Sequence, residues 1–153
     1  MRYVKRVLQA DETVVYETHL HPLIFLPAVL WLAIAVGLLI AAALYQDLLR
    51  LGLEIGAAAC ALLAFIAWAR AASRRATTEL AITDRRVIYK SGLLARHTLE
   101  MNRSKVESVD VDQSILGRMF GFGTIILRGT GGSLEPMRMI SDPLVFRSHI
   151  TAS

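Results

Sequence analysis

Three charged residues stand side by side in the stretch LAITDRRVIYKSGLL, residues 80–94, between two short runs rich in β-branched residues. The guanidinium groups of Arg85 and Arg86 can hold a phosphate or an anionic lipid headgroup through charge-assisted hydrogen bonds. Asp84 has another use, because its carboxylate can accept backbone N–H groups and stabilise a turn. The pattern favours a turn in which one arginine pairs with a nearby acid. Headgroup binding is the alternative.

The histidines and the common catalytic motifs give no sign of an enzyme. His19 and His21 form a His-x-His pair that could bind a metal, but no third ligand is visible nearby, so we expect polar residues at a membrane interface. The sequence has no Gly-x-Ser-x-Gly, His-Glu-x-x-His or dinucleotide-binding motif. GTGGS, residues 129–133, lacks the Gly-Lys-Ser/Thr ending of a phosphate loop and predicts a turn between strands. We expect a protein without catalysis, metal or cofactor.

Two long apolar blocks precede the charged turn in the sequence. Residues 23–44 contain no charge and, as a helix, would extend roughly 33 Å, about the thickness of a bilayer's hydrocarbon core. Residues 51–69 contain a single charge, Glu54, close to one end. The blocks predict a transmembrane two-helix hairpin over residues 22–72, with helices at about 23–44 and 51–70. A pair of buried helices in a soluble protein is the alternative, but such helices rarely stay apolar on every face.

Basic residues flank the hairpin unevenly. Arg2, Lys5 and Arg6 precede it, Arg70, Arg74 and Arg75 follow it, and the loop between the helices contains only Arg50. Loops rich in lysine and arginine stay in the cytoplasm, so both termini are predicted to be cytoplasmic and the protein to lie in the cytoplasmic (inner) membrane.

Small residues recur at four-residue spacing in both helices. Such stripes let helix backbones approach closely in lipid, and we expect them to close the hairpin on itself; docking of a partner helix or second copy is the alternative. Cys60 is the only cysteine in the sequence, which excludes an internal disulfide. We interpret it as a packing residue. The residues of the stripes are Ala33, Gly37, Ala41, Gly52, Gly56, Cys60 and Ala64.

The remaining 78 residues, 76–153, are predicted to form a small antiparallel β-sandwich or open barrel followed by a short helix. Strands are expected at 77–83, 86–92, 93–101, 105–113, 123–129 and 133–140. Asp142 and Pro143 predict a helix start, with Leu144, Phe146 and Ile150 on its apolar side. Residues 1–21 are assigned to a separate cytoplasmic segment.

The segment ILGRMFGFG, residues 115–123, is apolar although a loop is expected there. Its three glycines allow tight turns, so we expect a short helical turn that plugs the sheet, with Arg118 pointing outward. An exposed apolar contact for a membrane or a partner is the alternative.

The chain resembles the bacterial pleckstrin-homology (PH-like) membrane proteins of the YdbS-like type. The resemblance rests on Thr83-Asp84-x-Arg86, on Lys105-Val106-x-Ser108-Val109, and on the long run from Gln113 to Thr124; DETVVYETHLHP before the hairpin is similar too. It implies two packed antiparallel sheets closed by a C-terminal helix, and no reaction. The 78 residues are few for that fold, which implies an abbreviated strand or helix.

These observations predict a membrane-anchored binding or scaffold protein that recruits or organises partner proteins, including further copies of itself. Sensing of anionic lipid is the alternative. The region from Ala76 onward has ten basic and eight acidic residues, so its net charge of +2 is too small to make it a strongly basic lipid-binding surface. Nucleic acid is not an expected partner. The candidate contacts for lipid or partner are Arg70, Arg74, Arg75, Arg85, Arg86 and Arg118.

Overall fold

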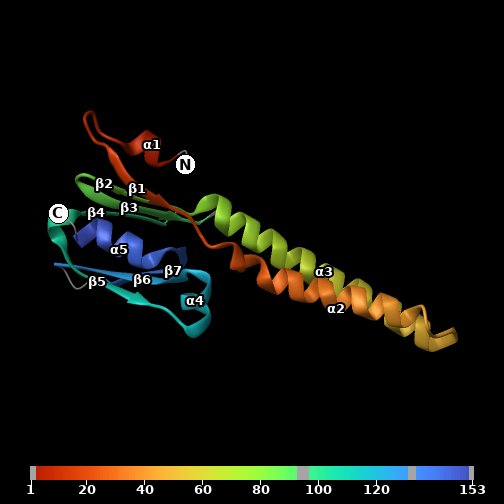
Figure 1. The fold of residues 1–153 in the computed structure, drawn as a ribbon. Coiled ribbons are helices and arrows are strands. Elements are labelled where there is room, and N and C mark those ends of the chain that lie inside the picture. Colours follow the sequence, from red (N-terminus) through yellow and green to blue (C-terminus); the bar gives the residue numbers. More distant parts are fainter. Residues whose placement is uncertain (1–2, 93–96, 131–133, 152–153) are drawn as a thin grey trace. The chain divides into compact units, whose positions relative to one another are not determined.

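The computed structural model describes residues 3–92, 97–130 and 134–151. The chain divides into two compact units (Figure 1). The β unit consists of Met1–His21 and Arg74–Ser153, and the helical unit of Pro22–Ser73. The helical unit is therefore an insertion within the β unit's sequence.

The helical unit consists of a short 3-10 helix, Pro22–Phe25, and the helices α2, Leu26–Ala42, and α3, Asp47–Thr77. α3 continues past Ser73, the last residue of the unit. Both helical segments, Pro22–Ala42 and Asp47–Thr77, are long and apolar enough to cross a membrane, judged by length and composition alone. The predicted hairpin is thus present as two helices.

The buried residues of the two helices are alanines at seven-residue spacing. They are Ala28, Ala35 and Ala42 in α2, and Ala57, Ala64 and Ala71 in α3. A seven-residue repeat stays on one side of an α-helix, drifting only ~20° per repeat, whereas a four-residue step drifts about twice as far. The seam of the hairpin therefore follows the heptad alanines.

The stripes predicted at four-residue spacing follow a different path. Of their residues only Ala64 is buried, and Ala41, Gly56 and Cys60 are half-buried. Ala33, Gly37 and Gly52 are exposed, contrary to the expectation that the stripes close the hairpin. A Cβ atom added at Gly37 or Gly52 would meet nothing within 4 Å.

The first sheet of the β unit is antiparallel, in the order β1-β2-β3-β4. Its strands are β1, Val14–Thr18; β2, Glu79–Thr83; β3, Arg86–Ser91; and β4, His97–Asn102. Thr18 pairs with Leu80 and Val87 with Met101. Leu80, Ile82 and Val87 are fully or almost fully buried, which makes β2 and β3 the centre of the sheet.

The second sheet is antiparallel, in the order β5-β6-β7. Its strands are β5, Val106–Asp112; β6, Phe122–Gly129; and β7, Leu134–Ser141. A 3-10 turn, Arg103–Lys105, precedes β5, and the short helix α4, Ile115–Phe120, joins β5 to β6. Ile125, Leu127, Met137 and Ile140 bury their side chains completely in this sheet.

The chain beyond β1 joins the two sheets. Leu20 forms an isolated bridge with Ile140. The Ser141 N–H donates to the carbonyl of His19 (3.1 Å), and the His21 N–H donates to the carbonyl of Met139 (2.8 Å). Residues 19–21 thus run along β7 immediately before Pro22, where the helical unit starts.

The terminal helix α5, Pro143–Thr151, lies between the two sheets in Figure 1 and contacts β1, β5 and β6. Pro143, Phe146 and Ile150 are its buried residues. Arg103 donates to the carbonyls of His149 (2.8 Å) and Ile150 (3.2 Å), so a cation binds the free carbonyls at the helix C-terminus. α5 begins at Pro143 as predicted, but Leu144 is exposed and not on the buried side.

The antiparallel sheets and the terminal helix confirm the PH-like α+β fold that the resemblance implied. The chain before the hairpin supplies β1, so residues 1–21 belong to the β unit. The sequence had assigned those residues to a separate segment. Residues 93–96 of one predicted strand and 131–133 of the predicted GTGGS turn lie outside the described residues.

Candidate functional site

The turn between β2 and β3 is stabilised by Thr83. Its hydroxyl oxygen accepts the backbone N–H groups of Arg85 (3.3 Å) and Arg86 (2.9 Å). Asp84, which the sequence predicted to stabilise the turn, instead binds the N-terminal segment. Its carboxylate accepts the N–H of Thr13 (3.1 Å), and its own N–H donates to the carbonyl of Thr13 (3.1 Å).

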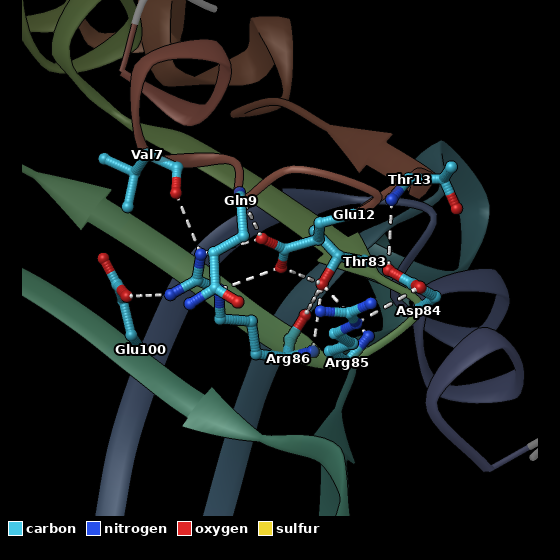
Figure 2. A network of polar contacts seen from close by, with 9 residues as sticks. All are labelled: Val7, Gln9, Glu12, Thr13, Thr83, Asp84, Arg85, Arg86 and Glu100. Carbon is cyan, nitrogen blue, oxygen red and sulfur yellow. Dashed lines mark hydrogen bonds and ion pairs between the residues drawn. The ribbon is translucent and has the colours of Figure 1, made fainter.

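Arg86 is the centre of a polar network (Figure 2). Its Nε and Nη2 donate to the two carboxylate oxygens of Glu12, at 2.9 and 2.8 Å. Nη2 also donates to the carbonyl of Val7 (2.9 Å), and Nη1 donates to Glu100 (2.7 Å). The Arg86 side chain is 13% exposed and that of Glu12 is 0% exposed. Arg86 therefore pairs with acidic side chains, as the favoured interpretation of the turn expected of one arginine, and holds the N-terminal segment to β3.

The hydrogen bonds from Arg86 lower the pKa of Glu12 to about 2, from 4.5, against an opposing effect of burial. The backbone N–H of Gln9 (2.9 Å) and the hydroxyl of Thr83 (2.8 Å) also donate to this carboxylate. All these donors favour the ionised form, so the network is strongest when Glu12 is charged.

This lowered pKa predicts that the folded chain loses stability at acidic pH. Because the pKa of Glu12 is lower in the folded chain, its contribution to stability is complete above pH 4.5 and is lost as the pH falls toward about 2. We expect roughly 2–3 kcal/mol of unfolding free energy to disappear over that range. Urea titrations followed by circular dichroism at pH 7 and at pH 3 would measure it.

The Glu12→Gln variant is the control, because glutamine of the same size cannot titrate. The acid-induced loss should be smaller in this variant than in the natural chain. Equal losses in the two proteins would show that other carboxylates account for the pH dependence.

A second carboxylate holds the start of the N-terminal segment. Glu79 accepts the N–H groups of Tyr3 (3.0 Å) and Val4 (3.1 Å), the latter being the first residue of the short helix α1, Val4–Val7. Val4 is completely buried against Ala81 and Ile88. Residues 3–13 are thus fixed to the outside of the first sheet by Glu79 at one end and by the Arg86 network at the other.

The remaining predicted basic residues, Arg70, Arg74, Arg75, Arg85 and Arg118, are exposed. The carboxylate of Asp84 lies 3.7 Å from Arg85 Nε, in an ion pair whose two side chains are both exposed. Such exposed pairs contribute little stability. The structure thus separates Arg85, at the surface, from Arg86, in the network.

α4 is the most exposed apolar element of the β unit. Ile115 is 80% exposed, Leu116 58%, Met119 72% and Phe120 53%. This contradicts the expectation that the segment plugs the sheet. Gly117, the one buried residue of the helix, faces inward, so the larger side chains must point away from the sheet.

Hydrogen bonds fix both ends of α4 to the neighbouring backbone; we call the residues that make them the frame of α4. The Ser114 hydroxyl accepts the N–H of Gly117 (3.1 Å) at the start of the helix. Gly121 ends the helix in the left-handed conformation (φ 73°), and its N–H donates to the carbonyl of Gly117. Gln113 donates to the carbonyl of Phe122 (3.1 Å). These residues belong to the Gln113–Thr124 run on which the family resemblance rests.

Gly117→Ala is expected to destabilise this frame. The added Cβ would lie 2.6 Å from the Phe122 carbonyl oxygen, a backbone atom that cannot move aside alone. We expect a loss of about 1–3 kcal/mol in the unfolding free energy, measured by urea titration. Gly52→Ala adds the same methyl group where nothing lies within 4 Å and should leave that free energy of the β unit unchanged.

His19 and His21 were the histidines considered for a metal site. Within the part of the chain that the structure describes, no group of three or more His, Cys, Asp and Glu residues is placed to hold a metal ion. The ring of His21 instead lies against that of Phe122, with centroids 5.3 Å apart. This contact joins the residue that precedes the helical unit to the strand that follows α4.

A comparison with protein families finds that the model of the bacterial PH domain matches residues 21–153. No curated protein and no solved structure matches the chain.

Proposed function

Because the chain belongs to the bacterial PH domain family, we propose that it is a membrane-anchored binding module that recruits or organises partner proteins at the cytoplasmic membrane. PH-like domains are generally non-catalytic binding modules, so family membership indicates a binding or scaffold role. Membership of the YdbS-like group is part of the proposal and is supported by the Gln113–Thr124 motif.

The insertion of the helical unit between β1 and β2 is the observation that carries the proposal. These strands are paired neighbours, with Thr18 opposite Leu80, so the helical unit connects two adjacent strands of one sheet. Both helices expose large apolar side chains, among them Leu39 and Ile40 in α2 and Ile55 and Phe65 in α3. Lipid is the natural solvent for helices with so much exposed apolar surface.

The proposed orientation follows from the charges at the helix ends. Arg70, Arg74 and Arg75 are exposed near the end of α3, whereas Arg50 beside the interhelical loop pairs with Glu54 at 2.8 Å. The bias of basic residues favours a cytoplasmic β unit with cytoplasmic termini.

Open strand edges offer a mode of partner binding. Among the described strands, β1 pairs only with β2, β4 only with β3, and β5 only with β6. An extended segment of a partner can add a strand at such an edge through main-chain hydrogen bonds, with side-chain pockets supplying specificity. We propose that the partner binds at the edge of β5, because α5 contacts this strand and its side chains lie beside it.

Cysteine labelling in intact cells tests the anchor. In a Cys60→Ser background, Gln46→Cys in the interhelical loop should react with an impermeant maleimide added outside the cell. Ser148→Cys on α5 should react only after the cells are permeabilised. Both positions are exposed. Labelling of both cysteines from outside, or of neither before permeabilisation, would contradict the proposed two-span topology.

Site-specific crosslinking tests the partner. A photoreactive amino acid at Glu107 in β5 should give a discrete adduct in native membranes, whereas one at Glu17 in β1, an edge strand of the other sheet, should give none; both positions are exposed. A chain that is monomeric and forms no adduct from Glu107 would contradict the scaffold role.

Anionic-lipid sensing is the second candidate, supported by the exposure of Arg74, Arg75 and Arg85 in the β unit. Each such residue near an anionic leaflet contributes about 1 kcal/mol, and salt weakens the attraction. In the reconstituted chain, a label beside Arg85 should come closer to the lipid headgroups when the lipid is anionic and move away when salt is added. Arg85→Ala should reduce both changes. The same behaviour in neutral lipid would exclude this role.

A further inference from the structure

We propose that α4 and the first turn of α5 form an apolar foot that inserts into the interfacial layer of the bilayer crossed by the helical unit. The foot is defined as Ile115, Leu116, Met119, Phe120, Leu144 and Val145, all exposed. This inference rests on the proposed membrane anchoring and adds a second, non-spanning contact to it. The contact would fix how the β unit is held against the membrane.

The two parts of the foot are continuous. The Asp142 N–H, one residue before α5, donates to the carbonyl of Gly121 at the end of α4 (2.9 Å). A hollow of about 290 Å³ lies between them, and its lining includes Arg118, Leu144 and Val145. Large exposed apolar patches on a folded domain mark binding surfaces, and this one comes from two elements.

The site lies at the end of the β unit from which the chain leaves for the helical unit. Phe122 contacts His21 across 5.3 Å between ring centroids, and Pro22 follows directly. Phe120 is only two residues from Phe122, a separation of at most about 7 Å. Whatever angle the helical unit takes, the start of its first apolar segment is tied within a short distance of the foot. This short tether favours lipid as the occupant over a separate protein.

The charged residues beside the foot, Arg118 and Asp142, also fit a position at the membrane–water interface. The exposed Arg118 can lay its stem over apolar surface and extend its guanidinium toward phosphate oxygens. Asp142 lines the same hollow, so the site has no strong positive charge. Insertion should therefore depend mainly on apolar side chains that enter about 5–10 Å into the boundary between headgroups and acyl chains, and it should persist in high salt.

Depth-resolved fluorescence tests the inference on the full chain in nanodiscs that hold one copy each. In a Cys60→Ser background, a polarity-sensitive dye is attached at Met119→Cys in the foot, at Val15→Cys as an exposed apolar control in β1, or at Leu39→Cys in α2. The nanodiscs contain phosphatidylglycerol and phosphatidylethanolamine with a spin label high on the acyl chain. Iodide serves as the aqueous quencher.

The dye at residue 119 should be quenched by the spin-labelled lipid at both low and high salt. Iodide should quench it about threefold less than the dye at residue 15, as expected for a site below the headgroups. Ile115→Ser should reduce the lipid quenching at residue 119 without changing that at residue 39.

Two results would overturn the inference while leaving the anchor intact. In the first, the dye at 119 is as accessible to iodide as that at 15 while the dye at 39 remains quenched by lipid. In the second, residue 119 is shielded from iodide without lipid quenching, which would assign the foot to protein. Loss of lipid quenching at residue 39 would instead contradict the membrane anchor itself.

Discussion

Arg86→Met should destabilise the β unit by about 3–5 kcal/mol, the usual cost of leaving one member of a buried ion pair alone. The substitution removes the donors to Glu12, Glu100 and the carbonyl of Val7. The Glu12 carboxylate would remain buried without its cation. Pulse proteolysis in urea of the reconstituted chain at pH 7 would measure the loss.

Arg85→Ala is the matched control, because the neighbouring arginine is exposed and its ion pair with Asp84 is open to solvent. Its effect should stay within about 0.5 kcal/mol. The double variant Glu12→Gln/Arg86→Met should recover part of the lost stability, since it removes the stranded charge. Equal effects of Arg85→Ala and Arg86→Met would contradict the separation of the two residues.

Phe146→Ala should have a similarly large effect, about 3–5 kcal/mol. Its ring is completely buried and meets that of Tyr16 edge-on, with centroids 6.3 Å apart. Truncation would leave a cavity between α5 and the sheets, and the same pulse-proteolysis assay would measure the cost.

Leu144→Ala, two residues earlier on an exposed face of α5, should cost less than about 1 kcal/mol. It tests the corrected orientation of the helix, because the sequence pattern had placed Leu144 on the buried side with Phe146. Comparable losses from the two variants would mean that Leu144 is also part of the core.

Local patterns predicted much of the fold. Long apolar runs predicted α2 and α3, and turn residues with β-branched runs predicted the strands after the hairpin. A proline preceded by aspartate correctly predicted where α5 begins. Each of these signals depends on residues close together in sequence, where the backbone preferences of the chain act directly.

Long-range pairing was not predictable in the same way. Val14–Thr18 has strand-forming residues, but its partner β2 lies beyond the whole helical unit. Glu12 and Arg86 are 74 positions apart, and no local pattern marks either as one half of a buried pair. The sequence therefore did not show which of Arg85 and Arg86 pairs with an acid, or that this acid is Glu12.

The prediction for α4 was wrong because apolar side chains were taken as a sign of burial. The glycine of the helix is the residue that packs, since a Cβ there would collide with the Phe122 carbonyl. The small side of the helix thus faces the protein, and the large side chains face outward. A buried glycine in a short apolar helix is the signal that distinguishes the two orientations.

The interrupted pairing of β1 and β2 also imposes an order of events during synthesis. Val14–Thr18 leaves the ribosome before the helical unit, and its partner Glu79–Thr83 leaves after it. At bacterial elongation rates the first strand waits roughly 3 to 12 s, with its edge unpaired. The first sheet can be completed only after both apolar helices have been made, so the folding of the β unit is coupled to their synthesis.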